Sequence, residues 1–297
     1  MIIASLFGGL GNQLFQYANA RAVSLRLGVE LQLDTSIIRG KEEVADFTNR
    51  DFELSVFNIN AGISDVKEVR KYVPNLLRTP KWFHQIYRIK RMFTGKHLFI
   101  ERTWNRFHYI PSIERVKDNT YLYGYFQTER FFKDIRAEIL DAIQLKPDIS
   151  VSTENQTIFN SMKNENAVSI HVRRGDYQNS NFMLLEMDYY AKAIERISET
   201  VKNPKFYIFS NDMDWVRHQF SNLNIDFQAI DINTGEQSYM DMILMSNCKH
   251  NIIANSTFSW WGAWLNTHED KVVIAPKNWF KQKDKSSELI PDEWIKI

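Results

Sequence analysis

The sequence of 297 residues lacks several features that would define its class. Its one cysteine, Cys248, excludes an internal disulfide and any zinc site built from cysteine pairs. Only 11 glycines and 7 prolines are present, which excludes collagen-like and low-complexity chains. No stretch approaches the roughly 20 apolar residues of a membrane span, and no secretory signal precedes Gly8. These absences predict a protein of a reducing, cytoplasmic compartment, either free or attached to the inner face of the plasma membrane.

An excess of charge of one sign is also lacking. Lys and Arg number 37 against 36 Asp and Glu, a formal net charge of +1, which excludes a generic nucleic-acid-binding protein. The exception is residues 78–106, where eight Lys or Arg and one acid, Glu101, are interleaved with aromatic residues. This stretch predicts either contact with an anionic membrane surface or a helical region that packs its aromatic residues and solvates its charges.

Strands and helices alternate along most of the chain. The pattern predicts an α/β protein with two Rossmann-like, doubly wound domains, residues 1–147 and 148–297, that face each other across a cleft. Residues 146–153 are the expected linker, and residues 40–118 give no clear pattern. Strands are expected at 1–7, 29–33, 121–126, 167–172, 205–210, 226–231, 251–254 and 272–275, and helices at 12–27, 129–143, 188–201, 236–247 and 258–265.

A glycine-rich loop follows the first expected strand. Gly8-Gly9-Leu10-Gly11-Asn12-Gln13 precedes a helix that Asn12 can cap. Glycine lets a backbone approach a ligand closely, and the amides at a helix N-terminus favour anions. Leu14 stands where a dinucleotide fingerprint has its third glycine, and no Gly-Lys-Ser/Thr follows. The loop is therefore either a ligand-binding turn of another kind or a turn that only packs.

A pair of arginines follows the strand expected at 167–172. In His171-Val172-Arg173-Arg174-Gly175-Asp176-Tyr177 the two guanidinium groups suit a pyrophosphate, because each offers a planar fork of donors. Gly175 permits a sharp turn, and Asp176 can hold one guanidinium in place. The alternative is a surface cluster of ion pairs.

Polar residues also follow the next strand, in Ser210-Asn211-Asp212. With Asp214 they form an Asp-x-Asp pattern, which resembles the signature of metal-dependent sugar transferases. The alternative is that Asp212 caps the helix that contains Trp215, with Asp214 in its first turn.

A third polar loop, Asn255-Ser256-Thr257-Phe258-Ser259, brings hydroxyls and amides to a helix N-terminus, which is an anion site. The tryptophans that follow it are expected to pack their helix on the sheet. On the preceding helix, Asp241 can accept the paired donors of guanine, or it is a solvated helix-face residue. The three polar loops are expected to meet along one edge of a parallel sheet and to hold a nucleotide diphosphate.

Together these motifs resemble those of a known family. Residues 8–18 look like the N-terminal signature of the α-1,2-fucosyltransferases, glycosyltransferase family eleven, and residues 171–177 are similar to its GDP-fucose-binding motif. Residues 210–212 and 255–265 match two later motifs of the family. The resemblance implies a GT-B fold whose first domain binds the acceptor and whose second domain binds the donor. It also implies an inverting transfer of L-fucose from GDP-β-L-fucose to the 2-hydroxyl of a terminal galactoside, with no cofactor and no required metal.

The animal members carry a membrane anchor that is lacking here, so the chain looks like a bacterial enzyme of surface-polysaccharide synthesis. Its expected partners are GDP-fucose and a galactose-terminated or lipid-linked glycan.

The resemblance also implies roles for single residues. Arg173 would neutralise the β-phosphate of departing GDP, and Asn12 would lie near the fucose and the acceptor hydroxyl. His171 and Asp241 would contact the nucleoside, with Asp241 reading guanine. The other implied donor contacts are Arg174, Ser210, Asn211, Asp212, Asn255, Ser256, Thr257, Phe258 and Ser259. The implied acceptor-side loop contains Gly9, Gly11 and Gln13.

The pattern does not identify the general base that an inverting transfer requires. Asp176 is a candidate, and the other role open to it is to hold an arginine. Two further functions fit the sequence: a metal-dependent sugar transferase that uses Asp212 and Asp214, and a non-catalytic protein that binds a nucleotide sugar or glycan.

Overall fold

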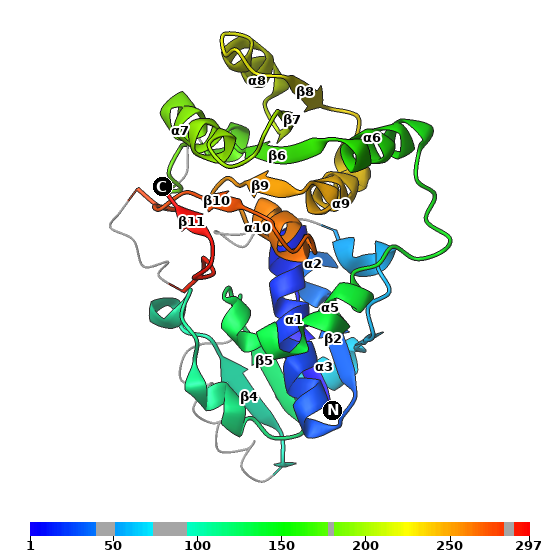
Figure 1. The fold of residues 1–297 in the computed structure, drawn as a ribbon. Helices are drawn as coiled ribbons and strands as arrows, with labels where there is room; N and C mark the ends of the chain where they lie inside the picture. Colours follow the sequence, from blue (N-terminus) through cyan, green and yellow to red (C-terminus); the bar gives the residue numbers. More distant parts are fainter. Residues whose placement is uncertain (40–50, 74–93, 178–180, 282–287) are drawn as a thin grey trace. The chain divides into compact units, whose positions relative to one another are not determined.

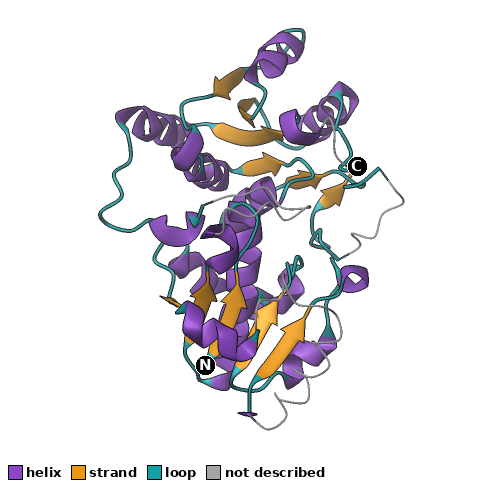
Figure 2. Ribbon diagram, turned by 180° about the vertical axis from the view of Figure 1, so that it is seen from behind, coloured by secondary structure: helices purple, strands orange, loops and turns teal. Residues whose placement is uncertain are grey.

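The computed structural model describes residues 1–39, 51–73, 94–177, 181–281 and 288–297. The chain divides into two compact units, Met1–Lys146 and Pro147–Ile297, one residue before the boundary expected from the sequence. Each unit contains one sheet with helices packed against it (Figure 1 and Figure 2).

The sheet of the first unit consists of β1 (Ile2–Ser5), β2 (Leu31–Asp34), β3 (Gly62–Ile63), β4 (His97–Ile100) and β5 (Thr120–Tyr123). Its strand order is β3-β2-β1-β5-β4, and all neighbours are parallel. Because the chain order reverses between β1 and β5, the loops after these two strands meet at the topological switch point. Open α/β sheets bind their ligands at this point, outside the carboxyl ends of the strands.

The longest helix in the described part of the first unit, α1 (Leu10–Leu27), packs on this sheet through fully buried side chains such as Leu14 and Ala18. It ends at Gly28, whose φ of 65° is left-handed and favours glycine. The other helices given for the described residues are α2 (Ser36–Arg39), α3 (Val66–Tyr72) and α5 (Arg136–Ala142), with 3-10 turns at Glu53–Val56, Thr103–Asn105, Pro111–Arg115, Glu129–Phe131 and Lys133–Ile135.

The sheet of the second unit consists of β6 (Asn166–Val172), β7 (Pro204–Ser210), β8 (Phe227–Ile230), β9 (His250–Ile252), β10 (Val273–Ala275) and β11 (Ile295–Lys296). Its order is β11-β10-β9-β6-β7-β8, again parallel throughout. Counted within the unit, this is the order 3-2-1-4-5-6 of dinucleotide-binding folds. The switch point lies between β6 and β9.

The helices of the second unit are α6 (Thr153–Asn164), α7 (Met187–Ser198), α8 (Met213–Phe220), α9 (Tyr239–Asn247) and α10 (Thr257–Leu265), with 3-10 turns at Gly175–Tyr177 and Gly235–Gln237. Trp260, Trp261 and Trp264 of α10 are at most 2% exposed, so the expectation that they pack the helix is confirmed. A Cβ on Gly262 would lie 2.9 Å from Met245, which shows how closely α9 and α10 approach. Within the described residues, none of the helices is long and apolar enough to cross a membrane.

Two local expectations are wrong. The expected helix over 129–143 is two 3-10 turns followed by α5, because the backbone of Phe132 (φ −147°, ψ 4°) leaves the helical region. This conformation buries the Phe132 ring against Phe15 at 5.9 Å. Asn12 does not cap α1: the capping position is Gly9, and Asn12 lies inside the first turn.

The sequence pattern does not predict helix α6 or strands β3, β4 and β11. The expected linker contains Ser152, which caps α6 by accepting a hydrogen bond from the backbone of Asn155 at 3.2 Å. Strands β3 and β11 have two residues each, too few to show an alternating pattern. Strand β4 lies within the basic and aromatic stretch, of which residues 78–93 lie outside the described part of the chain.

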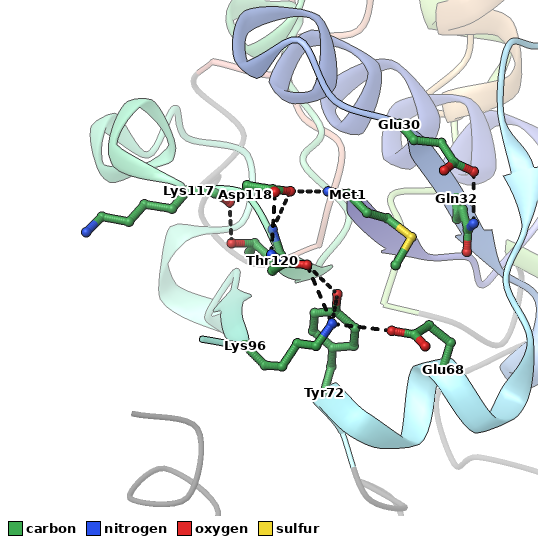
Figure 3. Close-up of polar contacts among 10 residues, drawn as sticks. Met1, Glu30, Gln32, Glu68, Tyr72, Lys96, Lys117, Asp118 and Thr120 are labelled. Atoms are coloured by element: carbon green, nitrogen blue, oxygen red, sulfur yellow. Dashed lines mark hydrogen bonds and ion pairs between the residues drawn. The ribbon is translucent and has the colours of Figure 1, made fainter. Parts of the chain in front are cut away.

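Polar contacts tie together the elements at the amino edge of the first sheet (Figure 3). Lys96 Nζ donates to the Tyr72 hydroxyl at 2.8 Å and lies 3.3 Å from Glu68 Oε1. The backbone nitrogen of Met1 pairs with Asp118. Because these groups bind one another, we interpret this edge as structural.

Candidate active site

The turn after β6 is packed against the segment that follows β7. The backbone N–H of Arg174 donates to Asn211 Oδ1 at 3.0 Å. A Cβ on Gly175 would lie only 2.9 Å from Asn211 Nδ2, so a larger residue here would displace the Asn211 amide. The motif thus lies at the end of a strand, as the sequence predicts, and Asn211 shapes its backbone.

The guanidinium of Arg174 is occupied within the second unit. It donates to the carboxylate of Glu186 at 3.1 Å and to the carbonyl of Leu185 at 3.2 Å. It also lies 4.2 Å over the ring of Trp215 and 4.0 Å from Asp212 Oδ2. Since Arg174 is only 8% exposed, these contacts give it a structural part in shaping the loop.

Arg173 is half-buried at the switch point between β6 and β9. Its guanidinium lies 5.8 Å from the ring centre of Tyr177. The Tyr177 hydroxyl donates to the carbonyl of Asn255 at 3.0 Å and so joins the loop after β6 to the loop after β9. The charge of Arg173 therefore lies where sheets of this order bind nucleotides. The side chain of Asp176 lies outside the described part of the structure.

The two aspartates of the Asp-x-Asp pattern are used for the local structure of α8. Asp212 Oδ1 accepts a hydrogen bond from the backbone of Trp215 at 3.2 Å, so the capping interpretation is confirmed. The Asp212 backbone is in turn held by the Ser210 hydroxyl at 2.9 Å. The carboxylate of Asp214 is exposed and lies 3.9 Å from Arg217. In the described part of the chain, no three His, Cys, Asp or Glu side chains are grouped to hold a metal ion.

The loop after β9 divides into side chains that hold it and side chains at its surface. Asn255 Nδ2 donates to the carbonyls of Met183 and Trp279, each at 2.8 Å, and Asn255 is fully buried. Ser259, also fully buried, donates to the carbonyl of Ala254 at 3.4 Å. Both residues were expected at the ligand, and the structure gives them a scaffold position instead.

The N-terminus of α10 is the part of this loop that can meet an anion. Ser256 caps the helix by accepting from the backbone of Phe258 at 3.4 Å. Thr257 and Phe258 are half-buried in the first turn. The ring of Phe258 lies 5.7 Å from that of His171, which comes from the end of β6. The loops after β6, β7 and β9 therefore meet, as the sequence predicts.

Asp241 lies in the first turn of α9, next to α10 in the fold. It is half-buried rather than solvated on a helix face. Burial raises the pKa of its carboxyl group to about 7, against the opposing effect of a 2.8 Å hydrogen bond from Asn233. At neutral pH the group is therefore close to the midpoint of its titration.

The switch point of the first unit joins the glycine loop to the segment after β5. Gly8 has a φ of 77°, and a Cβ there would lie 2.5 Å from Asn12 Nδ2. On its other side, Asn12 Oδ1 accepts a hydrogen bond from Gln127 Nε2 at 2.8 Å. Asn12 is half-buried, so its amide is held in a defined orientation at this edge.

The rest of the glycine loop serves the backbone. Gln13 is fully buried and donates to the carbonyls of Gly8 at 2.9 Å and Asp51 at 2.8 Å. Gly9 is the capping position of α1, and Gly11 is buried inside the helix. These three residues shape the loop that presents Asn12.

Four residues at these edges escaped the sequence reasoning: Glu101, Gln127, Asn155 and Asn233. Glu101 is 9% exposed, and its carboxylate accepts from the backbones of Tyr125 at 2.6 Å and Phe126 at 3.2 Å. Its one signal was its position as the only acid of a basic stretch. The three amides had no signal, because their partners are distant in the sequence.

Comparisons with known proteins agree with this architecture. The family model described as "Glycosyl transferase family 11" matches residues 2–297. The chain is 35% identical to the "O-antigen biosynthesis glycosyltransferase WbnK" of Escherichia coli, over 98% of this chain and 99% of that protein. It is 30% identical to the "Alpha-1,2-colitosyltransferase" of Escherichia coli, over 100% of this chain and 99% of that protein.

A solved structure of a mutant of Arabidopsis thaliana FUT1 in complex with GDP superposes with a TM-score of 0.50. It covers 92% of this chain and 69% of that chain at 10% identity, so the likeness concerns the fold alone. The expected GT-B fold with two Rossmann-like units is confirmed.

Proposed function

Because the chain belongs to glycosyl transferase family 11, we propose that it transfers L-fucose from GDP-β-L-fucose to the 2-hydroxyl of a terminal galactoside. The reaction inverts the anomeric carbon and forms an α-1,2 linkage. The observation that carries this proposal is the switch point of the second unit. Arg173 and the N-terminus of α10 lie there and match the diphosphate of a nucleotide sugar, and Asp241, at the same carboxyl edge of the sheet, matches its base.

On the donor side, charge grows on the β-phosphate as the bond between fucose and GDP breaks. Arg173 and the amides of α10 stabilise this charge. The Asp241 carboxylate accepts the N1 and N2 hydrogens of guanine, with His171 and Phe258 beside the nucleoside. Arg174 acts indirectly, since its bonds to Glu186 and Leu185 hold the loop from which Arg173 projects.

On the acceptor side, Asn12 orients the hydroxyl that attacks, and Gln127 fixes the Asn12 amide. Asp176 is the candidate base that takes the hydroxyl proton. The transfer needs no metal and no cofactor. Support for this comes from the aspartates of the Asp-x-Asp pattern, because Asp212 caps α8 and Asp214 faces solvent.

A second donor is favoured by one specific likeness. The relative named "Alpha-1,2-colitosyltransferase" is 30% identical over the whole chain, so GDP-colitose is the alternative to GDP-fucose. In either case we place the reaction in O-antigen synthesis, in line with the name of the 35% identical relative. The acceptor is then a galactose-terminated, lipid-linked glycan.

The test is transfer from GDP-fucose and, separately, GDP-colitose to a panel of β-galactosides in the presence of EDTA, followed by linkage analysis. An α-1,2-fucosylated product supports the donor, the linkage and metal independence together. Transfer of colitose alone would reassign the donor. Activity that EDTA abolishes would favour the metal-dependent alternative, and GDP binding without turnover on any acceptor would favour the binding protein.

We also propose that the enzyme works in the cytoplasm at the inner face of the plasma membrane, through residues 78–106. The described end of this stretch supports the idea: Trp104 is 64% exposed, and Arg102 lies 4.9 Å over its ring. Such a pair suits the headgroup region of an anionic bilayer. Sedimentation with anionic vesicles should recover the protein, and a Trp104→Ala variant less of it. Equal recovery with neutral vesicles, or none with either, would contradict the proposal.

A further inference from the structure

Two buried side-chain amides, those of Asn155 and Asn233, are bonded to each other, and Asn233 is also bonded to Asp241. Asn155 Nδ2 donates to Asn233 Oδ1 at 2.8 Å, and Asn233 Nδ2 donates back to Asn155 Oδ1 at 3.0 Å. Asn233 Nδ2 also donates to Asp241 Oδ1 at 2.8 Å. Asn155 and Asn233 are 3% and 7% exposed, so these bonds are made away from water.

The reciprocal bonds fix the orientation of the Asn233 amide. Its two amide hydrogens go to Asn155 and Asp241, and its oxygen accepts from Asn155. Rotating the amide by half a turn would place its oxygen against the Asp241 carboxylate and break both bonds of the pair. Asn155 is anchored in turn by the Ser152 hydroxyl at 3.2 Å. Asn233 is therefore held as a donor to Asp241.

The three residues come from different segments that meet at one edge of the sheet. Asn155 lies in the first turn of α6, which precedes β6, and Asp241 lies in the first turn of α9, which precedes β9. Asn233 follows the end of β8. Because the strands are parallel, helices that precede strands begin at the carboxyl edge, which is where ligands bind.

We propose that the Asn155–Asn233 pair positions the Asp241 carboxylate for the nucleobase and thereby sets the preference for guanine over adenine. The proposal rests on the proposed function, in which Asp241 reads guanine. Guanine presents two adjacent donors, N1–H and the N2 amino group, to a carboxylate. Adenine has a lone pair at N1, which a carboxylate repels. A carboxylate that is fixed and ionised therefore discriminates, whereas a protonated or displaced one discriminates less.

The titration of Asp241 supports this geometry. Burial raises its pKa and the bond from Asn233 lowers it, with a result of about 7. The charged residues on the elements packed against it are exposed: Glu154 and Lys163 on α6, and Asp231 and Glu236 between β8 and α9. On α9 itself Tyr239 is the other titratable side chain, and α10 carries none. Loss of the Asn233 bond should therefore leave Asp241 protonated at neutral pH.

The experiment is calorimetric binding of GDP and of ADP from about pH 6 to about pH 9. The proteins are the wild type, Asn233→Ala, Asn155→Ala and Asp241→Asn. The Asp241→Asn profile supplies the baseline, because it retains the ionisation of the GDP phosphates. As a matched control, Asn266→Ala removes a fully buried amide at the opposite edge of the same sheet.

We expect wild-type GDP affinity to fall below about pH 7 relative to this baseline. In Asn233→Ala the midpoint should move to higher pH, and GDP binding at pH 7 should weaken about fivefold for the first pH unit by which the midpoint rises and about tenfold for each further unit. The two affinities should converge above the new midpoint, and the preference for GDP over ADP should fall. Asn155→Ala should move the midpoint in the same direction by less, because the Asn233 donor remains. Asn266→Ala should leave the midpoint in place.

An affinity lowered by one factor at every pH would mean a merely structural role and would overturn the proposal. Unchanged midpoints in both variants, with an unchanged preference for GDP, would do the same. If Asn233→Ala does not fold, the midpoint of Asn155→Ala decides. A wild type that binds no GDP would overturn the proposed function as well, so the two failures are distinguishable.

Discussion

Each of the two sheets has polar loops at its topological switch point, but the side chains at these loops differ in kind between the two units. At the switch point of the second unit stand Arg173 and the N-terminus of α10, and the half-buried carboxylate of Asp241 lies at the same carboxyl edge of the sheet, in the first turn of α9. At that of the first unit the amides of Gln127 and Asn12 are bonded to each other at 2.8 Å, and the Glu101 carboxylate at this edge is occupied by the backbone N–H groups of Tyr125 and Phe126. A diphosphate needs cations and amide dipoles, whereas a sugar hydroxyl needs a neutral partner of fixed orientation. The fold thus sets where a ligand binds, and the side chains set which class of ligand it is.

Of the substitutions that test this difference between the two units, removal of the Arg173 guanidinium should have the largest effect on the rate of transfer. Arg173→Ala should lower the rate of transfer about 10²–10³-fold, because the departing diphosphate loses a preorganised partner. Initial rates with GDP-fucose at saturating acceptor measure it. The matched control is Arg196→Ala, which removes an exposed arginine on α7 paired with Glu199. A rate within about twofold of the wild type would remove Arg173 from the mechanism.

The half-buried carboxylate of Asp241 should make the stability of the folded chain depend on pH. Asp241 has a pKa of about 7 in the folded chain against 3.8 for its ordinary value. The folded state therefore binds this proton more tightly, and stability is lost as the pH rises from about 4 to about 7. Asp241→Asn should be more stable than the wild type by about 2 kcal/mol at pH 8, after allowance for partial exposure. Urea unfolding followed by tryptophan fluorescence measures it, and a gain that persists undiminished toward pH 4 would contradict the assignment.

Removal of the Asn12 amide, in the first unit, should affect transfer to the acceptor and not the binding of GDP. Asn12→Ala should slow transfer about tenfold and leave GDP affinity unchanged, because Asn12 serves the acceptor in this proposal. Steady-state kinetics against acceptor concentration, together with GDP calorimetry, separate the two quantities. Asn58→Ala, which truncates an exposed asparagine of the same unit, is the control. Parallel losses of turnover and GDP affinity would count against a division of labour between the two edges.

Sequence reasoning located the second edge better than the first for a physical reason. Strands β6 and β7, with seven residues each, are long enough to show apolar runs, and polar loops follow β6, β7 and β9 at once, so that Arg173, Asn211 and Ser256 could be expected at one edge. In the first unit no described strand exceeds four residues, and the turn at Phe132 breaks a helical pattern that would otherwise continue. Tertiary packing overrode the local signal there.

The direction of a side chain was harder to predict than its neighbourhood. Arg173 and Arg174 are adjacent and alike in sequence, yet one lies at the switch point and the other packs on Trp215. Asn255 was expected to face the ligand and instead ties two backbone segments together. Asn155 and Asn233 are 78 positions apart in the sequence, and no local pattern around either residue indicates that the two amides pair.

The smallest effect is expected from alanine substitutions at Gly8, in the glycine loop, and at Gly28, at the end of α1. Gly8 and Gly28 have φ values of 77° and 65°, so an alanine at either should destabilise the first unit by about 1 kcal/mol through backbone strain. Only at Gly8 would the new Cβ meet a side chain, since Asn12 Nδ2 lies 2.5 Å away, whereas nothing lies within 4 Å at Gly28. A lowered urea midpoint in both variants, at least as low in Gly8→Ala, with a loss of transfer confined to Gly8→Ala is therefore expected. An equal loss of transfer in Gly28→Ala would mean that general strain, and not the placement of the Asn12 amide, limits the reaction at this edge.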